Sequence, residues 1–184
     1  MNPRLIKYYL LYLLKAQNRH GLHPPFVYQL LDEVIYRKRC RKIYAEMEQA
    51  AQLLPDDGKV RFSNKINRLL FRFAEHFESQ SIAFTVDVSN LTRLYILRGA
   101  AKAEVITGSH AQCLVCDAAT LSYNFEAIQP GDMLIVTHPY HSSAAVANWR
   151  RIKQNPNVTV TIDLFEFGLA FCRPQQRENF MLRF

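Results

Sequence analysis

Two histidines and an aspartate follow short apolar runs where strands are expected to end. His138 and His141 lie in the segment His138-Pro139-Tyr140-His141, after the run from Met133 to Val136, and Asp117 follows Leu114-Val115-Cys116. Sites of α/β proteins lie at the carboxyl ends of strands, where these side chains would act as a general base or as metal ligands. The alternative, which we favour, is that both histidines are surface loop residues.

Cys113 and Cys116 have C-x-x-C spacing within an apolar run. If that run is a strand, residues three apart point to opposite faces. The two thiols then cannot share a metal ion or a redox turn. Cys40 and Cys172 complete the four cysteines, and without an export signal the sequence predicts reduced thiols.

Positive charge is concentrated in the first part of the chain. Of the formal net charge of +7, residues 1–72 carry +8, because they hold 14 Lys or Arg against 6 Asp or Glu. The densest cluster consists of Arg37, Lys38, Arg39, Arg41 and Lys42. Such a cluster is typical of surfaces that follow an RNA backbone. The alternative, which we favour, is a solvated linker between two helices.

Apolar residues in the first third recur three and four apart, which predicts helices. The predicted helices cover Leu5–Ala16, Phe26–Ile35, Ile43–Leu54 and a stretch that begins after Ser63. Pro24 and Pro25 suit a first helical turn, and Ser63 suits an N-cap.

From Ser81 onward, short apolar runs alternate with helical stretches. The predicted strands are Ile82–Val86, Glu104–Thr107, Cys113–Cys116 and Met133–Thr137, and the predicted helices are Leu91–Arg98, Ala118–Ile128 and Ser143–Gln154. Short apolar strands that alternate with helices predict a parallel sheet covered on both faces.

The last segments predict a hairpin. Val158–Ile162 alternates, Glu166-Phe167-Gly168 is a predicted turn, and Leu169–Arg173 and Phe180–Phe184 are predicted to be extended. Strands joined by so short a turn must be antiparallel. The sequence therefore predicts an α/β fold in one compact unit, with a helical segment over residues 1–78 packed on a core over residues 79–184.

The helical stretch Leu5–Leu14 is apolar nearly all round, apart from Lys7. It falls short of the ~20 apolar residues of a membrane span, and no small-residue cleavage site of a signal peptide follows it. We therefore expect a cytoplasmic protein without a membrane span. An apolar helix of this kind would serve as a homodimer contact.

Segments near both ends of the chain have a specific pattern. Asn18-Arg19-His20-Gly21-Leu22-His23-Pro24-Pro25-Phe26 stands near the start, and Ser142 with Trp149, Ile162–Phe165 and Gly168–Arg173 stand near the end. Together they resemble a bacterial group of class I S-adenosylmethionine-dependent methyltransferase-like proteins, which begins with Asn-Arg-His-Gly-x-His-Ser-Pro-Phe. The resemblance implies a Rossmann-like methyltransferase sheet over nearly the whole chain.

The resemblance also implies where S-adenosylmethionine would bind. In the group, the first strand ends in an acid and continues into a glycine-rich turn that lets the backbone approach the cofactor. Here Phe84 stands at the acid, and Val86 and Asn90 stand at the glycines. Thr107 replaces a second acid, which would bind ribose hydroxyls, whereas Asp117 matches a later acid of the group.

Two further departures concern the architecture and a metal. The group carries a helix and another strand where this chain has only Ser109 to Cys113, so one βα unit is expected to be missing. The acid pair after the group's fifth strand is replaced by Thr137-His138. Because those carboxylates would be the natural ligands of a divalent cation, no metal is expected.

These departures predict a methyltransferase-like protein that has lost methyl transfer, holds no cofactor, and serves as a scaffold or binding protein. Arg19, His20 and His23 match the N-terminal motif and would line the cleft, or would cap and pack a helix end. Two alternatives stay open. One is an active methyltransferase that holds S-adenosylmethionine in a rebuilt pocket, and the other is an RNA-associated protein that uses the basic cluster.

Overall fold

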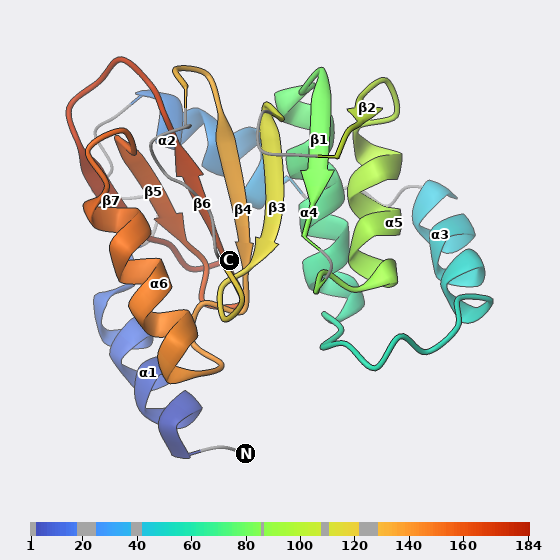
Figure 1. The fold of residues 1–184 in the computed structure, drawn as a ribbon, viewed down its shortest axis with the longest axis horizontal. Coiled ribbons are helices and arrows are strands. Elements are labelled where there is room, and N and C mark those ends of the chain that lie inside the picture. The colour runs from blue at the N-terminus through green and yellow to red at the C-terminus, as the bar shows by residue number, and fades with distance from the viewer. Residues whose placement is uncertain (1–2, 18–24, 38–41, 86, 108–110, 122–128) are drawn as a thin grey trace.

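The computed structural model describes residues 3–17, 25–37, 42–85, 87–107, 111–121 and 129–184, which form a sheet flanked by helices (Figure 1). The helices of the first third are α1 (Pro3–Lys15), α2 (Pro25–Leu30), the π-helix η1 (Leu31–Ile35), α3 (Lys42–Gln52) and α4 (Asn64–Phe77). The later elements are β1 (Ser81–Phe84), α5 (Asn90–Gly99), β2 (Glu104–Val105), β3 (Cys113–Asp117), β4 (Met133–Thr137), α6 (Ser143–Gln154), β5 (Val160–Asp163), β6 (Phe167–Phe171) and β7 (Glu178–Met181). None of the described helices is long and apolar enough to cross a bilayer.

The sheet confirms the predicted fold class. Its strand order is β2-β1-β3-β4-β6-β5-β7, and the pairings are parallel except those of β6 with β4 and β5. The chain passes from β1 to β2 on one side and then to β3 on the other side. In Rossmann-like sheets, ligands bind at the carboxyl ends of the strands beside such a switch point.

The connection from β2 to β3 is short, and its described residues form no helix. Val105 and Cys113 are both in register with Ile82 of β1, so the chain does not have to travel back along the sheet. It crosses only two strand spacings, roughly 10 Å, which residues 106–112 can reach. Among the described residues, the sheet has no strand, and the connection no helix, of the unit that the resemblance implied at this point.

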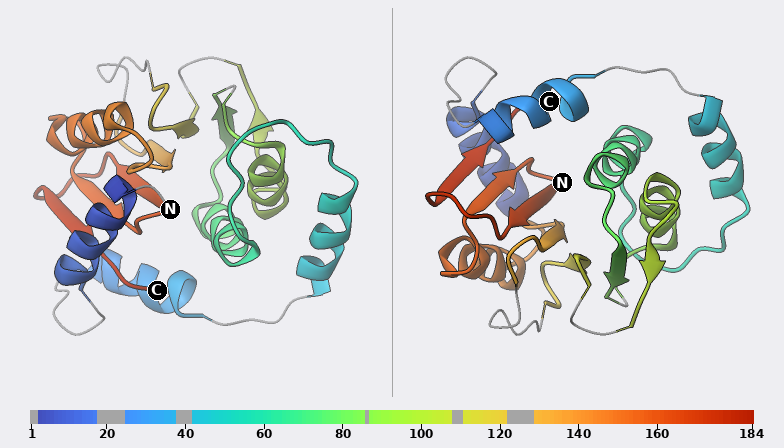
Figure 2. Two further views of the ribbon diagram at one scale, coloured as in Figure 1. Left: turned by 90° about the horizontal axis from the view of Figure 1, so that it is seen from below. Right: turned by 90° about the horizontal axis from the view of Figure 1, so that it is seen from above.

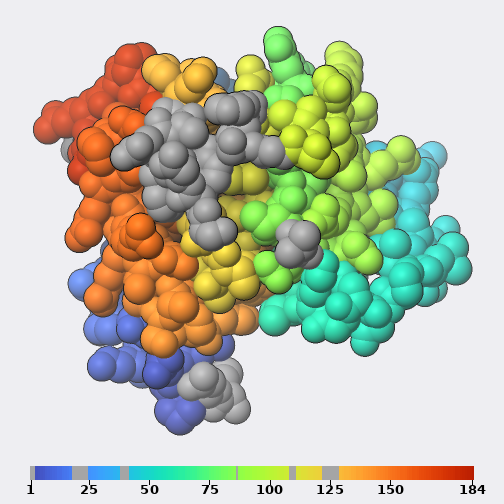
Figure 3. Space-filling view, in the orientation of Figure 1, coloured from blue at the N-terminus to red at the C-terminus, as the bar shows by residue number. Residues whose placement is uncertain are grey.

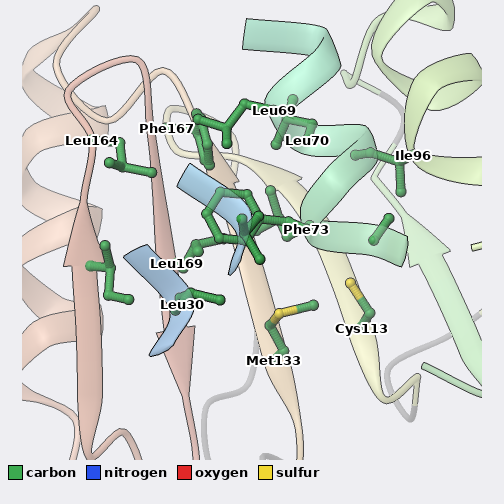
Figure 4. Packing of buried hydrophobic residues seen from close by; sticks show 14 of the residues in the cluster. Leu30, Leu69, Leu70, Phe73, Ile96, Cys113, Met133, Leu164, Phe167 and Leu169 are labelled. Atoms are coloured by element: carbon green, nitrogen blue, oxygen red, sulfur yellow. The ribbon is translucent and has the colours of Figure 1, made fainter. Parts of the chain in front are cut away.

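A separate hydrophobic core covers each face of the sheet. The first core is formed by α2, η1 and α4 against the strands, and brings Phe73 of α4 and Leu30 of α2 together with Met133 and Leu169 of the sheet (Figure 4). The second core lies under α6 and α1. Figure 2 shows α6 on the opposite side of the sheet from α2.

Cys113 and Cys116 confirm the prediction that their thiols point to opposite faces. Cys113 lies in the first core and Cys116 lies in the second. Burial raises the pKa of Cys113 to about 12 and also raises the pKa of Cys116. Both thiols are therefore protonated at neutral pH and act as small apolar side chains.

The predicted helix Phe26–Ile35 forms, but its second half is π-helical. The Tyr36 amide donates to the carbonyl of Leu31, five residues earlier, and the wider turn buries Leu31, Val34 and Ile35 together. The Val34 carbonyl accepts a hydrogen bond from Arg72 of α4. Within the predicted helix Ala118–Ile128, the structure has a turn at residues 118–120, and residues 122–128 lie outside the described ranges.

The hairpin turn lies at residues 164–166, earlier than predicted, and Phe167 and Gly168 belong to β6. The glycine serves packing rather than the turn, because a Cβ at position 168 would lie 2.4 Å from the Trp149 ring. The left-handed conformation of the turn falls instead on Phe165, with φ of 65°. β7, the third predicted extended segment, pairs in parallel with β5.

A buried carboxylate fastens α6 to this hairpin. Asp163 is fully buried and accepts hydrogen bonds at Oδ2 from the Tyr140 hydroxyl, the Trp149 indole and the Lys153 ammonium. Its Oδ1 accepts from the Phe165 amide in the turn. Four donors from three segments thus converge on one side chain. Their hydrogen bonds compensate for the loss of water around the buried carboxylate.

We expect Asp163→Ala to lower the free energy of unfolding by about 2–4 kcal/mol, because buried donors lose their acceptor. Urea unfolding followed by circular dichroism measures this loss. Asp56→Ala is the matched control, since the Asp56 side chain is 85% exposed in its ion pair with Arg61; its cost should stay below about 1 kcal/mol. Equal costs for the two variants would contradict this role of Asp163.

Candidate functional site

Asp117 and His138 meet at the carboxyl ends of β3 and β4. His138 Nδ1 lies 2.9 Å from Asp117 Oδ2, and the Thr137 hydroxyl donates to the same oxygen at 3.0 Å. The Ala119 amide donates to the other carboxylate oxygen. Adjacent parallel strands therefore bring together two residues that are far apart in sequence, at the edge of the sheet where the site was expected.

His138 is a buried residue, so its interpretation as a surface loop residue was wrong. It is 6% exposed and adopts a left-handed backbone conformation with φ of 55°. Its amide donates to the carbonyl of Glu166 in the hairpin turn. The Phe62 ring stacks on its imidazole, with centroids 4.4 Å apart. His141 is exposed and its ring lies 4.6 Å from that of His138.

The ionisation of this cluster follows from its contacts. Burial opposes the charge of Asp117, but hydrogen bonds from His138, Ala119 and Thr137 outweigh it and lower the pKa of the carboxyl. His138 Nδ1 is directed at the Asp117 carboxylate. The other ring nitrogen, Nε2, is buried without a hydrogen-bond partner among the described residues.

Two neighbouring groups also have shifted pKa values. Desolvation lowers the pKa of His141, and the adjacent His138 lowers it further. Burial raises the pKa of Glu166 in the hairpin turn. A carboxylate that holds an imidazole in one tautomer is the arrangement of an oriented general base, and here the ring face of that imidazole is covered by Phe62.

The segment after β1 is fastened by Arg93 of α5. The guanidinium donates to the carbonyls of Thr85 and Val88 and lies 4.8 Å from the centroid of the Phe84 ring. The Lys59 ammonium also donates to the Val88 carbonyl. Phe84, at the position of the expected acid, is therefore a packing partner of Arg93 and supplies no polar group.

The first turn of α5 is capped from within the chain. Ser89 is the N-cap and accepts from the Thr92 amide, and the Asn90 amide donates to Asp57 Oδ2 at 2.6 Å. This hydrogen bond lowers the pKa of Asp57, whose negative charge is also favoured at a helix N-terminus. The helix end that binds anions in many α/β proteins is thus occupied by a carboxylate of the chain.

The structure does not bring all the predicted positions together. Thr107 lies beyond β2, is exposed, and forms no hydrogen bond with Asn90 or Asp117 within the described parts of the chain. Val86, the cleft candidates Arg19, His20 and His23, and residues 38–41 of the basic cluster lie outside the described ranges. Arg37 and Lys42 are described at its two ends and are exposed. The RNA contact stays a prediction.

No group of three or more His, Cys, Asp or Glu side chains in the described ranges could hold a metal ion. Asp117, His138 and His141 lie near one another, but His138 Nδ1 is directed at Asp117. The two residues are thus paired with each other in this conformation.

Three contributors to the site were missed at the level of sequence. Asp57, Phe62 and Arg93 have no role in the sequence prediction. Asn90 lies 33 residues after Asp57, and His138 lies far beyond Phe62 in the sequence, so local spacing gives no signal for these two contacts. For Arg93 a signal exists, because a lone arginine one turn into a helix can reach back to the carbonyls of its own entry loop.

No protein-family model matches the chain, and no curated protein sequence matches it. Among solved structures, Rv0187 from MTB, in a cofactor-bound form, is 14% identical, with a TM-score of 0.49 over 85% of this chain and 100% of that one. The O-methyltransferase TomG from Streptomyces achromogenes, in complex with SAM, is 14% identical, with a TM-score of 0.47 over 76% and 93%. An O-methyltransferase from Bacillus cereus, in complex with SAH, is 12% identical, with a TM-score of 0.47 over 79% and 96%.

Proposed function

We propose that this protein is a methyltransferase-like scaffold that binds a partner and does not transfer methyl groups. The observation that carries the proposal is the hydrogen bond from the Asn90 amide to Asp57 Oδ2. This carboxylate already occupies the first turn of α5. A cofactor that binds there with a charged group has to compete with Asp57. Displacing Asp57 costs its hydrogen bonds with both Asn90 and Lys59.

At two of the positions that the resemblance implies, Phe84 and Thr107, the residues present do not fit S-adenosylmethionine. Phe84 supplies no carboxylate and packs under Arg93, whose guanidinium holds the Thr85 and Val88 carbonyls. The Thr85 and Val88 carbonyls cannot move to admit a ligand without breaking these hydrogen bonds from α5. Thr107 is exposed beyond β2 and supplies no carboxylate for a ribose.

Within this proposal, Asp117 and His138 form a structural pair. The pair links the ends of two adjacent strands, and the Glu166 carbonyl ties His138 to the hairpin turn. Phe62 covers the ring and connects it to the segment that carries Asp57.

One observation favours a second candidate function, an active methyltransferase with a rebuilt pocket. His138 Nε2 is buried without a partner in the described part of the chain, and its other nitrogen is oriented by a carboxylate. Such an atom would accept a proton from a substrate hydroxyl. This candidate requires Phe62 to move away from the ring.

Calorimetric titration with S-adenosylmethionine and S-adenosylhomocysteine separates the two candidates. We expect no saturable heat up to about 1 mM ligand, which corresponds to binding weaker than about −4 kcal/mol. A thermal unfolding transition measured on the same sample confirms that the protein is folded. Micromolar binding of either compound would overturn the scaffold proposal, and His138→Ala would then be tested for loss of methyl transfer.

If Asp117 serves to stabilise the fold, its contribution to the free energy of unfolding depends on pH. Its folded-state pKa lies below the ordinary value of 3.8, so its stabilisation is complete above that pH and is lost as the pH falls through the folded pKa. We expect Asp117→Asn to cost about 1.5–3 kcal/mol at pH 7. The cost should shrink at the lowest pH at which both proteins remain folded, as measured by urea unfolding.

The control for this variant is Asp87→Asn, because Asp87 is exposed and should cost less than about 0.5 kcal/mol at either pH. A cost for Asp117→Asn that does not change with pH would show that the charge of Asp117 contributes nothing to folding.

A further inference from the structure

The outward face of α1 is a row of exposed aliphatic side chains. Ile6, Leu10 and Leu14 follow one another at intervals of four residues and are 37%, 56% and 83% exposed. This spacing places them on one side of the helix. We call these three residues the α1 stripe. Figure 1 and Figure 3 show α1 at one end of the molecule, with its first turns projecting beyond the sheet.

The inner face of α1 is fixed to the body of the protein. Tyr12 is 5% exposed and its hydroxyl donates to the carbonyl of Leu182. The Tyr8 ring lies 5.3 Å from the ring of Tyr140, and the Tyr9 ring lies 4.9 Å from that of Phe165. Because these contacts set the rotation of the helix, the α1 stripe is held toward solvent in the folded protein. A fixed, exposed aliphatic row of this kind marks an interaction surface.

Helix α1 also carries positive charge. Helix α1 contains Arg4, Lys7 and Lys15 and no acidic residue, and the first acidic residue of the chain is Asp32. Between α1 and α6 lies a cavity of about 220 Å³, which Lys15, Arg150 and Lys153 line together with aromatic side chains. Lys153 is paired with Asp163, and both Lys15 and Arg150 are exposed.

We propose that α1 docks this protein on the surface of membranes that contain anionic phospholipid. The α1 stripe would enter the boundary between headgroups and acyl chains, and lipid phosphates would meet the cations at the groove between α1 and α6. An apolar stripe and a basic border are the two signals that together give stable peripheral binding. Neither signal alone is strong enough for such binding.

Charge favours this partner over a second copy of the chain. A two-fold contact through α1 would bring Lys7 and Lys15 of one copy near the cations of the other copy. Residues 1–31 contain no acid that could pair with them. Like charges across a contact oppose association. An RNA backbone would satisfy the cations but would leave the aliphatic side chains of Leu10 and Leu14 without an apolar environment.

The test is co-sedimentation of the full chain with vesicles. Vesicles of phosphatidylcholine mixed with phosphatidylserine should bind the protein, and vesicles of phosphatidylcholine alone should bind it at least about tenfold more weakly. Added salt should weaken the binding, because it screens the cations from the lipid phosphates. The double variant Leu10→Ser with Leu14→Ser, and separately Lys15→Glu, should each reduce binding at least about tenfold.

Matched controls lie elsewhere on the surface. Leu53→Ser removes an equally exposed leucine, at 86%, beyond the end of α3, and Lys102→Glu reverses an exposed charge between α5 and β2. Both should bind anionic vesicles like the unchanged protein. Circular dichroism of every variant confirms folding, which is expected because the replaced side chains are exposed.

Several outcomes would overturn the proposal. These are equal binding to the two kinds of vesicle, binding by the Leu10→Ser with Leu14→Ser variant equal to that of the unchanged protein, and no binding at low salt. Sedimentation of a lipid-free dimer that dissociates in the same double variant would also overturn it, because the α1 stripe would then belong to a second copy.

Discussion

The buried carboxylate of Asp163 is the contact on which the rest of the molecule depends most directly. It ends β5, receives Trp149 and Lys153 from α6 and Tyr140 from the preceding loop, and bonds the amide of Phe165 in the hairpin turn. An ionised carboxylate is tolerated without solvent only where its oxygens are fully used. The position of α6, the approach of Trp149 to Gly168 and the shape of the turn are therefore set together.

The hairpin turn contacts both the Asp117–His138 pair and helix α1. On one side the Glu166 carbonyl holds the His138 amide, which keeps His138 in its left-handed conformation beside Asp117. On the other side the Phe165 ring packs on Tyr9, Tyr12 and Tyr140, which places α1. The hydroxyls of Tyr12 and Tyr140 stay protonated, because burial raises the pKa of both. One turn thus connects the carboxyl edge of the sheet with the exposed helix.

Local sequence patterns predict the sheet well, because alternation within a strand depends on neighbouring residues. The opposite burial of Cys113 and Cys116 and the antiparallel pairing of β5 with β6 both follow from spacing alone. The turn was misplaced because Gly168 looks like a turn residue, whereas its small size serves a tryptophan from another helix. The sequence does show a lone aspartate at position 163 among apolar residues, but the donors that make it tolerable come from α6 and the loop before it. His138 was misjudged for the same reason, since its burial depends on Phe62 and Asp117.

The distribution of charge follows from where the carboxylates are used. Asp57 caps α5, Asp117 orients His138, and Asp163 gathers donors from α6, so these three acids are committed to contacts within the fold. The acid-free stretch of residues 1–31 contributes its cations to the surface around α1. A chain with a formal net charge of +7 therefore concentrates positive charge at its N-terminal end. The two ends of the molecule therefore differ. At the carboxyl edge of the sheet the polar side chains hydrogen-bond to one another, whereas α1 exposes both aliphatic and cationic side chains.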